Sequence, residues 1–438
     1  MFGNKVGHLG RVGSLTLAQR VSAMFSRGEP GAWYDPSDMS TLFQDSAGTT
    51  PVTAVEQPVG RMLDKSGRGN HATQATTTKR PVLSRRVNLL VKTEQFDDGV
   101  WVKSGLGTGS APSVTSNTAT APDGTLTASQ VNLAIGGGTN SSDWSWLYQN
   151  ISRTAGESAS FTIWIKAATP ADIGRVVILT GFDSDTVRLS AEWEMHELPD
   201  LPVVAGTFSY GVRLRGDETP GAGTVSFHVW GASLTRTTDA HLPYQWVNTA
   251  TDYDADPSKF PAYLRFDGVD DALQTGSINF TSTDKMTVWA GITKLSEALQ
   301  LLVELSATAN TNNGAFKVLA ADPPGTEIAA SSRGTAANAL NQVSEMSAAS
   351  PGSFVLSSAS DIAGDLVALR VNSIAAPQAV GDQGAGNYGN YPLYIGARAG
   401  TSLFFNGRIY SLIVRGAQSS LSQIEATELY IKQKMRMP

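Results

Sequence analysis

The sequence Asp143-Trp144-Ser145-Trp146-Leu147-Tyr148-Gln149-Asn150 places a large aromatic side chain at every second position. Successive side chains of a β-strand point to opposite faces of the sheet. Trp144, Trp146 and Tyr148 therefore share one face of the strand that this alternation indicates. The stretch predicts a β-strand with one aromatic face.

Short segments of similar character continue along the chain, separated by turns rich in Gly, Pro, Asp and Ser. We expect strands at Phe161–Ile165, Arg175–Leu179, Thr224–Trp230, Tyr263–Phe266, Met286–Ile292, Leu301–Leu305, Phe316–Leu319, Leu366–Val371, Leu393–Ile395 and Arg408–Val414. The small, polar region Ala329–Ser353 is expected to form a long loop. With 438 residues, 43 glycines and 20 prolines, the sequence predicts an all-β protein of antiparallel sandwiches.

Helices are expected near both ends of the sequence. Thr16 and Gln19 have the spacing of a capping box, as do Ser422 and Glu425 at the start of a helix predicted over Leu421–Lys434. Apolar residues recur on one face of the first helix at Leu17, Val21, Met24 and Phe25. A helix of two turns is marginal alone, so it needs a surface, either on its own body or on a larger assembly.

Charge and cysteine content exclude several classes of partner. Lys and Arg total 33 against 39 Asp and Glu, so we expect no nucleic-acid partner. The sequence has no cysteine, which excludes a disulfide framework and Cys-ligated zinc. No apolar stretch approaches the roughly 18 residues of a membrane span. Arg11 and Arg20 lie where a signal peptide needs its apolar core, so we expect synthesis in the cytoplasm without a signal peptide and no membrane insertion.

Several motifs carry a resemblance to a known family. They are Trp33-Tyr34-Asp35-Pro36, Asp64-Lys65-Ser66-Gly67-Arg68-Gly69-Asn70-His71-Ala72, Leu264-Arg265-Phe266-Asp267-Gly268-Val269-Asp270-Asp271 and Phe405-Asn406-Gly407-Arg408-Ile409-Tyr410. With these motifs the sequence resembles the concanavalin-A-like, laminin-G-like jelly rolls of bacteriophage and prophage proteins. The resemblance implies an antiparallel jelly roll that ends in the C-terminal helix. It identifies architecture better than ligand.

The second and third motifs normally lie close in sequence, but here a long piece separates them. That piece opens at Asn88-Leu89-Leu90 and Trp101, closes at Trp230-Gly231-Ala232-Ser233 and Pro243-Tyr244, and resembles a carbohydrate-binding-module-like jelly roll of phage fibres and spikes. We therefore expect three parts. They are an N-terminal particle-attachment arm (1–30), a discontinuous sandwich (31–84 with 248–438), and a second sandwich inserted in one of its loops (85–247).

Two groups of residues are candidates for glycan binding, because sugars need flat aromatic rings flanked by hydrogen-bonding side chains. The first group combines the aromatic face of the opening stretch with its polar neighbours: Trp144, Trp146, Tyr148, Asp143, Gln149 and Asn150. If that face points inward, its rings are core residues instead. The second group is Tyr388 and Tyr391, in a segment rich in Gly and Asn that can equally be an ordinary hairpin loop.

One acidic group has the chemistry of a calcium site. Asp267, Asp270 and Asp271 can offer carboxylate oxygens to calcium, as in some laminin-G-like domains, or cap turns by accepting backbone hydrogen bonds. The five histidines show neither zinc spacing nor a partnered nucleophile, and no Gly-x-Ser-x-Gly sequence occurs. We therefore expect no enzyme, no catalytic residue and no cofactor, with calcium as the one alternative to a metal-free protein.

These observations predict non-enzymatic binding of bacterial surface polysaccharide, such as a capsule, by a fibre or spike of a phage or phage-like particle. A gene-transfer-agent head spike is one such particle component. The expected partners are the polysaccharide and other virion proteins, joined through the N-terminal arm, and the expected location is the virion surface. The prediction leaves open a homo-oligomer or a paired spike protein. Two alternatives remain, a structural or decoration virion protein without glycan binding, and a polysaccharide depolymerase.

Overall fold

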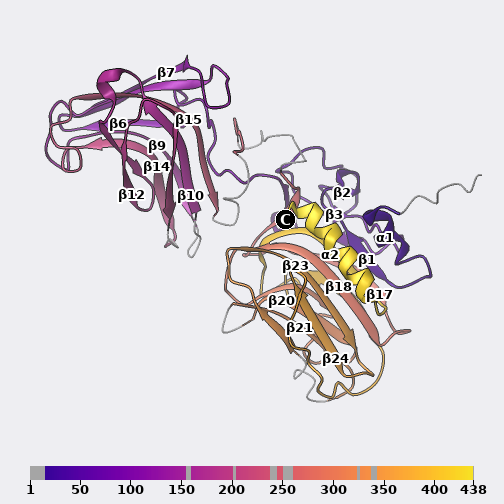
Figure 1. Ribbon diagram of the computed structural model, residues 1–438. Coiled ribbons are helices and arrows are strands. Elements are labelled where there is room, and N and C mark those ends of the chain that lie inside the picture. The colour runs from indigo at the N-terminus through magenta and orange to yellow at the C-terminus, as the bar shows by residue number, and fades with distance from the viewer. Residues whose placement is uncertain are drawn as a thin grey trace, which may run out of the picture.

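The computed structural model describes residues 15–153, 159–200, 204–236, 244–249, 260–322, 326–336 and 343–437. Figure 1 shows two β-sandwiches, one in the purple to magenta part of the chain and the other mainly in the orange part. The strands of each sheet pair in antiparallel fashion. The prediction of an all-β protein built from antiparallel jelly-roll sandwiches is confirmed.

The first sandwich comprises strands β6 to β15 in two five-stranded sheets. The β9 sheet has the order β12 (Ser184–Arg188), β11 (Val176–Thr180), β14 (Gly206–Arg215), β9 (Trp144–Arg153) and β6 (Val102–Leu106). The β10 sheet has the order β13 (Glu194–Asp200), β10 (Ala159–Ala167), β15 (Thr224–Arg236), β8 (Ala128–Ala134) and β7 (Ser110–Ala119). A short 3-10 helix, η3 (Pro170–Asp172), follows β10.

The core of the first sandwich comes from alternate positions of both sheets. Leu147 of β9, Phe161 of β10 and Val212 of β14 are at most 2% exposed and belong to one cluster. Residues two apart on a strand line the same face, so each strand sends every second side chain into this core. Full burial of such a side chain is worth about 1.5 to 3 kcal/mol relative to exposure.

The second sandwich has an eight-stranded and a nine-stranded sheet. The eight-stranded sheet contains β25 (Ile374–Ala375), β24 (Leu366–Val371), β23 (Gly352–Asp361), β18 (Lys285–Lys294), β27 (Asn406–Arg415), β16 (Tyr263–Asp267) and β5 (Val82–Ser84) in this order, with β1 (Gly31–Tyr34) also paired to β27. The nine-stranded sheet has the order β2 (Leu42–Phe43), β3 (Arg61–Met62), β4 (Ala72–Thr73), β17 (Leu273–Asn279), β26 (Asn390–Ile395), β19 (Gln300–Leu305), β20 (Ala315–Asp322), β21 (Glu327–Arg333) and β22 (Val343–Ser347). Two 3-10 helices, η1 (Met39–Thr41) and η2 (Thr77–Lys79), lie between the early strands.

Segments from both sides of the first sandwich share the sheets of the second. Trp33 of β1 pairs with Ile413 of β27, and Leu83 of β5 pairs with Leu264 of β16. Strands β6 to β15 pair among themselves in the described residues. This connectivity is what an inserted sandwich requires. The domain boundaries at residues 30, 84 and 247 stay a prediction, which deletion can test.

Residues of the sequence motifs hold the second sandwich together. The carboxylate of Asp35 is 1% exposed and lies 3.1 Å from the Nζ atoms of both Lys65 and Lys434. Tyr430 donates its hydroxyl to the same carboxylate at 3.1 Å. Burial opposes ionisation of Asp35, but Lys434 and Lys65 outweigh it and lower its pKa. The motif around Asp35 is therefore architectural.

Both predicted helices are present, α1 (Leu17–Ala23) and α2 (Leu421–Met435). The capping box of Thr16 and Gln19 is confirmed. The predicted box of Ser422 and Glu425 is wrong, because Ser420 is the residue with extended backbone before α2 and Gln423 completes its box. No helix in the described part of the chain has the length and apolarity that a membrane span needs.

Helix α1 packs on the body of the protein, which is one of the two alternatives left open by the sequence. Figure 1 shows α2 lying on the eight-stranded sheet with α1 beside it. Val21, Met24 and Phe25 are at most 4% exposed and share a cluster with Ile413 of β27 and Ile431 of α2. Residues 15–30 are therefore part of the fold, and the rest of the predicted attachment arm lies outside the described residues.

The long loop expected over Ala329–Ser353 is wrong. Strand β21 extends to Arg333, β22 follows, and β23 begins at Gly352. Ile328 and Ala330 of β21 are at most 1% exposed. The Ala and Ser residues of β21 have a weak intrinsic preference for strands. They lie in a strand because pairing with β20 outweighs that preference.

Candidate functional site

The aromatic stripe, defined as Trp144, Trp146 and Tyr148 of β9, lies on the outer face of its sheet. All three residues are partly exposed, whereas Ser145 and Leu147 between them are buried. Leu147 belongs to the core of the first sandwich, and the residues of that core include none of the stripe. The alternative in which these rings are core residues is therefore excluded.

Neighbouring polar groups fix the rings of the stripe. The ring centroids of Trp146 and Tyr148 are 4.3 Å apart and their planes are inclined by 36°, which is close to the spacing of favourable aromatic pairs. Trp146 Nε1 donates a hydrogen bond to Thr180 Oγ1 at 3.1 Å, and Trp144 Nε1 donates to Ser104 Oγ at 3.4 Å. These bonds satisfy the polar edge of each indole. The Trp146 ring also packs against Tyr148, so only its exposed part remains for other contacts.

Strand β14 shapes the surface beside the stripe. Arg213 stands opposite Trp146, and Gly211 stands opposite Tyr148 and Thr180. The guanidinium carbon of Arg213 lies 5.6 Å from the ring centroid of Trp146, and its Nε donates to Glu218 at 2.9 Å. A cation at this distance is attracted to the electron-rich face of the indole. The result is an aromatic surface bordered by a positioned guanidinium.

Asn150 is the predicted polar residue that shares the outer face with the stripe. Its side chain is exposed, and its Oδ1 accepts a hydrogen bond from Ser209 Oγ of β14 at 2.8 Å. An amide in this position can donate and accept hydrogen bonds. The stripe therefore has an aromatic centre with polar groups on two sides, Asn150 and Arg213.

Asp143 and Gln149 do not belong to this surface, which corrects the predicted site. Asp143 is 5% exposed, and its carboxylate accepts hydrogen bonds from the backbone nitrogens of Thr108 and Asn140 at 2.9 and 3.0 Å. These bonds lower the pKa of Asp143. Gln149 is 2% exposed and exchanges hydrogen bonds with the backbone of Val91. Both side chains hold loops in place instead of facing solvent.

The two predicted tyrosines lie on the second sandwich and differ from each other. Tyr388 is 1% exposed, and its hydroxyl lies 2.6 Å from Ser360 Oγ. Burial raises the pKa of Tyr388 to about 12. Its ring is therefore closed to a ligand, and we remove it from the candidate residues. Tyr391 is partly exposed and donates its hydroxyl to the carbonyl of Asn313 at 3.3 Å, so the structure leaves one of the two rings at the surface.

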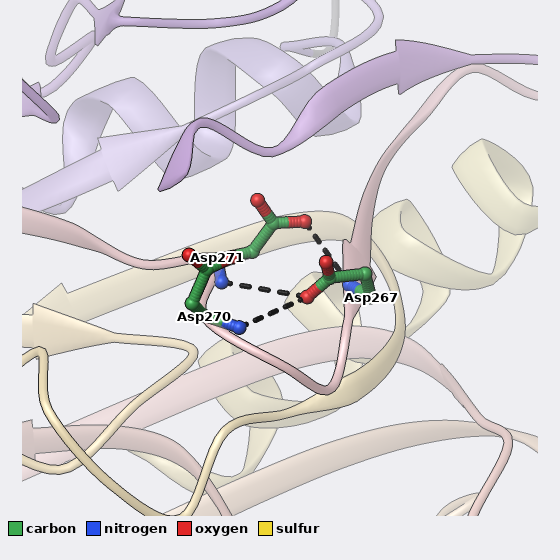
Figure 2. Close-up of side chains that lie close together, drawn as sticks. All are labelled: Asp267, Asp270 and Asp271. Carbon is green, nitrogen blue, oxygen red and sulfur yellow. Dashed lines mark hydrogen bonds between the residues drawn. The ribbon is translucent and has the colours of Figure 1, made fainter. Parts of the chain in front are cut away.

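The acidic group of Asp267, Asp270 and Asp271 is compact, as Figure 2 shows. Oxygen atoms of the three carboxylates lie within 4.8 Å of one another. Asp267 Oδ1 accepts hydrogen bonds from the backbone nitrogens of Val269, Asp270 and Asp271 at 2.8, 3.2 and 3.4 Å. Asp271 Oδ2 accepts one from the nitrogen of Asp267 at 3.0 Å. This is the turn-capping geometry that the sequence left as an alternative to calcium.

The electrostatics of this acidic group bear on metal binding. Burial and the neighbouring Asp267 raise the pKa of Asp271 to about 7. A cation would favour the ionised form of Asp271 and oppose that shift. Calcium takes about six to eight oxygen ligands, so three carboxylates supply only part of its shell. Calcium binding at this group stays a prediction.

Sequence reasoning missed the residues that complete the stripe. Arg213 and Thr180 come from strands far from β9 in sequence, and only strand register brings them beside Trp146. A long-range register has no local sequence signal. The inward position of Gln149 did have a local sequence signal. Gln149 is two residues from Leu147, so the two side chains share the inward face.

No family model and no curated protein matches the sequence. The structure is similar to part of NanB solved with Optactamide, at 20% identity and a TM-score of 0.28 over 37% of this chain and 26% of that chain. It is similar to the CBM40 of the Ruminococcus gnavus IT-sialidase bound to α2,3-sialyllactose, at 19% identity and a TM-score of 0.26 over 33% and 83%. The receptor-binding domain of botulinum neurotoxin type G matches at 12% identity and a TM-score of 0.30 over 41% and 43%.

Carbohydrate-binding and receptor-binding domains are thus among the solved structures that parts of this chain resemble. The chain spans about a quarter of the NanB chain, 26%, and 43% of the neurotoxin domain chain. The strand pairing and the outer face of β9 define the class of protein. The protein is built of two antiparallel β-sandwiches, and one of them carries a partly exposed aromatic stripe.

Proposed function

We propose that the protein binds a polysaccharide through the outer face of the β9 sheet. The observation that carries the proposal is the outward position of Trp144, Trp146 and Tyr148 beside the buried Leu147. Large aromatic side chains are usually buried, and a row of them on a solvent face is typical of a recognition surface. The indole faces would stack on the apolar C–H faces of sugar rings.

The polar border of the stripe would set the orientation of the bound sugar. Arg213 is held by Glu218 beside Trp146 in the middle of the stripe, and Asn150 is exposed next to its Tyr148 end. Their hydrogen-bonding groups can meet sugar hydroxyls on either side of a stacked ring. Hydroxyl desolvation offsets much of each hydrogen bond, so a single site would bind weakly and many copies would be needed for firm attachment.

The proposed target is a polysaccharide of the bacterial surface, such as a capsule. The proposed setting is a fibre or spike on the surface of a phage or phage-like particle, joined to other virion proteins by the N-terminal segment. This setting rests on the resemblance carried by the motifs at Trp33, Asp64 and Leu264. Display in many copies on one particle would supply the multivalency that weak sugar sites need.

Binding to cells tests this proposal. The fluorescently labelled protein is expected to bind encapsulated cells and to leave capsule-free cells of the same strain unlabelled. Trp146→Ala should lose most of the binding. Trp193→Ala is the matched control, because Trp193 is also partly exposed but lies immediately before β13 of the opposite sheet. Equal labelling of both cell types, or equal binding by Trp146→Ala and the unaltered protein, would overturn the proposal.

A further inference from the structure

A second recessed surface of the first sandwich lies beside Trp246. It is a pocket of about 470 Å³, and its lining includes Trp246, Glu94, Asp97, Asp98 and Asn117. Trp246 exposes 40% of its surface, and the other tryptophans are all less exposed. A pocket of this volume falls within the range of sites for small ligands, and its exposed indole offers a stacking surface.

A β-bulge brings a polar side chain to this pocket. Asn117 lies within β7 with a φ of 56°, in the left-handed region. The register of β7 with β8 shifts between Thr115 and Ala119, around the same residue. Bulges redirect side chains next to functional sites. The amide of Asn117 adds hydrogen-bond donors and an acceptor to the pocket wall.

The charge of the pocket selects the ligand. Glu94, Asp97 and Asp98 contribute carboxylates, and the described residues of the lining include no Lys or Arg. Two lysines outside this lining lie near its acidic residues: Lys92 Nζ approaches Asp98 at 3.5 Å, and Lys103 Nζ donates to the backbone carbonyls of Asp97 and Asp98 at 3.1 and 2.9 Å. Glu94 accepts a hydrogen bond from the hydroxyl of Tyr244 at 3.2 Å. Asp97 is exposed. Ionised carboxylates only accept hydrogen bonds, so they favour a ligand that donates them and carries positive charge.

We propose that this pocket binds a sugar residue that carries a positively charged amino group. The sugar ring stacks on Trp246, its ammonium group faces the carboxylates of Glu94, Asp97 and Asp98, and Asn117 contacts its hydroxyls. The exposed indole also attracts the cation directly. Acidic sugars are rejected because their carboxylate would meet like charge. This site is separate from the aromatic stripe, so the inference stands whether or not the stripe binds glycan.

Fluorine NMR tests the proposal. The chain has nine tryptophans, and labelling with 5-fluorotryptophan gives each indole its own reporter. Trp246→Phe assigns the Trp246 signal by its loss. Glucosamine is expected to shift this signal in a saturable manner, and glucuronate, which has a similar ring and the opposite charge, is expected to leave it unchanged. A Trp246 signal that ignores glucosamine, or that responds equally to both sugars, would overturn the proposal.

Asp97→Asn tests the role of charge with little effect on folding, because Asp97 is exposed. It should weaken glucosamine binding roughly two- to fivefold, as expected for loss of one exposed ion pair. Asp185→Asn is the matched control, since Asp185 is an exposed aspartate on β12. Equal glucosamine affinity in Asp97→Asn and in the control would contradict the placement of the ammonium group. The signals of Trp144 and Trp146 report on the stripe in the same spectra, so failure at one site is distinguished from failure at the other.

Discussion

The indole of Trp146 on β9 reaches across β14 to the hydroxyl of Thr180 on β11, where Nε1 and Oγ1 are 3.1 Å apart. Strand β14 lies between the other two in the sheet, and Gly211 is the residue of β14 that pairs with Thr180. A β-carbon at position 211 would lie 1.9 Å from the carbonyl oxygen of Leu147. Glycine at position 211 thus lets β14 lie this close to β9, and the hydroxyl of Thr180 in the next strand holds the crossing indole.

Thr180→Val should release this indole. Valine has nearly the shape of threonine but cannot accept the hydrogen bond, so the ring loses its fixed orientation. We expect polysaccharide affinity to fall by roughly 0.5 to 1.5 kcal/mol, the usual worth of one such bond. Titration calorimetry measures the affinity, and Thr186→Val on the exposed β12 is the control. Unchanged affinity in Thr180→Val would show that the orientation of the ring is irrelevant.

Trp146→Ala and Leu147→Ala are neighbouring substitutions with opposite expected effects. Trp146→Ala removes a surface ring and should cost about 1 to 3 kcal/mol of binding if the ring is a hot spot, with a small change in melting temperature. Leu147→Ala leaves a cavity in the core and should cost about 2 to 5 kcal/mol of stability. Calorimetric binding and thermal unfolding on both variants check the two effects. A large loss of stability in Trp146→Ala alone would count against the outer-face site.

Asp271 should make stability depend on pH. Its pKa of about 7 lies above its ordinary value of 3.8. Its contribution is therefore fully present below about pH 4 and is lost as pH rises toward 7, because the unfolded chain ionises first. Asp271→Asn should raise the melting temperature more at about pH 8 than at about pH 4. Thermal unfolding at both values checks this, with Asp185→Asn, at an exposed aspartate on β12, as the control.

The variant Asp271→Asn also tests whether the acidic group binds calcium. If the acidic group only caps its turn, adding calcium at about pH 8 should leave the melting temperature unchanged. A rise in the melting temperature that calcium causes in the unaltered protein, and that Asp271→Asn removes, would instead identify a metal site at Asp267, Asp270 and Asp271.

Removing residues 1–28 should destabilise the second sandwich, because α1 contributes Val21, Met24 and Phe25 to a buried cluster. Arg415 would also lose its hydrogen bond to the carbonyl of Met24, which is 2.9 Å long. We expect a lower melting temperature for the truncated protein. We expect the same for Val21→Asp in the full chain, because a carboxylate would be placed in the apolar cluster. Removal of residues 1–14 alone is the control. Identical unfolding of all these proteins would show that α1 contributes nothing to stability.

Deleting residues 86–246 tests the insertion. Gln245 Nε2 donates a hydrogen bond to the carbonyl of Arg85 at 3.2 Å, so the residues at the two cuts lie close together and a short Gly/Ser linker should join them. We expect the remaining chain to keep β-sheet circular dichroism and a cooperative unfolding transition. Loss of folded structure with every linker length tried would mean that the second sandwich needs the first.

Every strand expected from the sequence is present, as is helix α1, because alternation and capping act over a few residues. Strands β17, β21, β22 and β23 were not among the expected segments. The alternation of residues 143–150 showed which side chains share a face, but period two alone does not say which face is buried. Packing of the β9 sheet against the β10 sheet buries Leu147 and leaves Trp146 on the outer face. The prediction for Tyr388 was wrong because its burial depends on contacts with distant residues such as Ser360 of β23.

The polar partners were the weakest part of the prediction, and the cause is physical. Asp143 and Gln149 are adjacent to the stripe in sequence, yet their hydrogen bonds to Thr108, Asn140 and Val91 direct them into the structure. Arg213 is distant in sequence and adjacent in space. Contacts between strands thus decide which polar groups border the rings.

Alternating positions of β9 have two different roles, packing of the core and contact with the solvent. Leu147 serves folding, whereas its neighbours Trp146 and Tyr148 meet the solvent. Substitutions at the outward positions can therefore vary what the surface recognises while the packing inside stays intact. A library confined to residues 144, 146, 148 and 150, with 145, 147 and 149 held fixed, should yield folded proteins of altered sugar preference. The outward residues of β9 can thus be exchanged to change recognition while the fold that carries them stays the same.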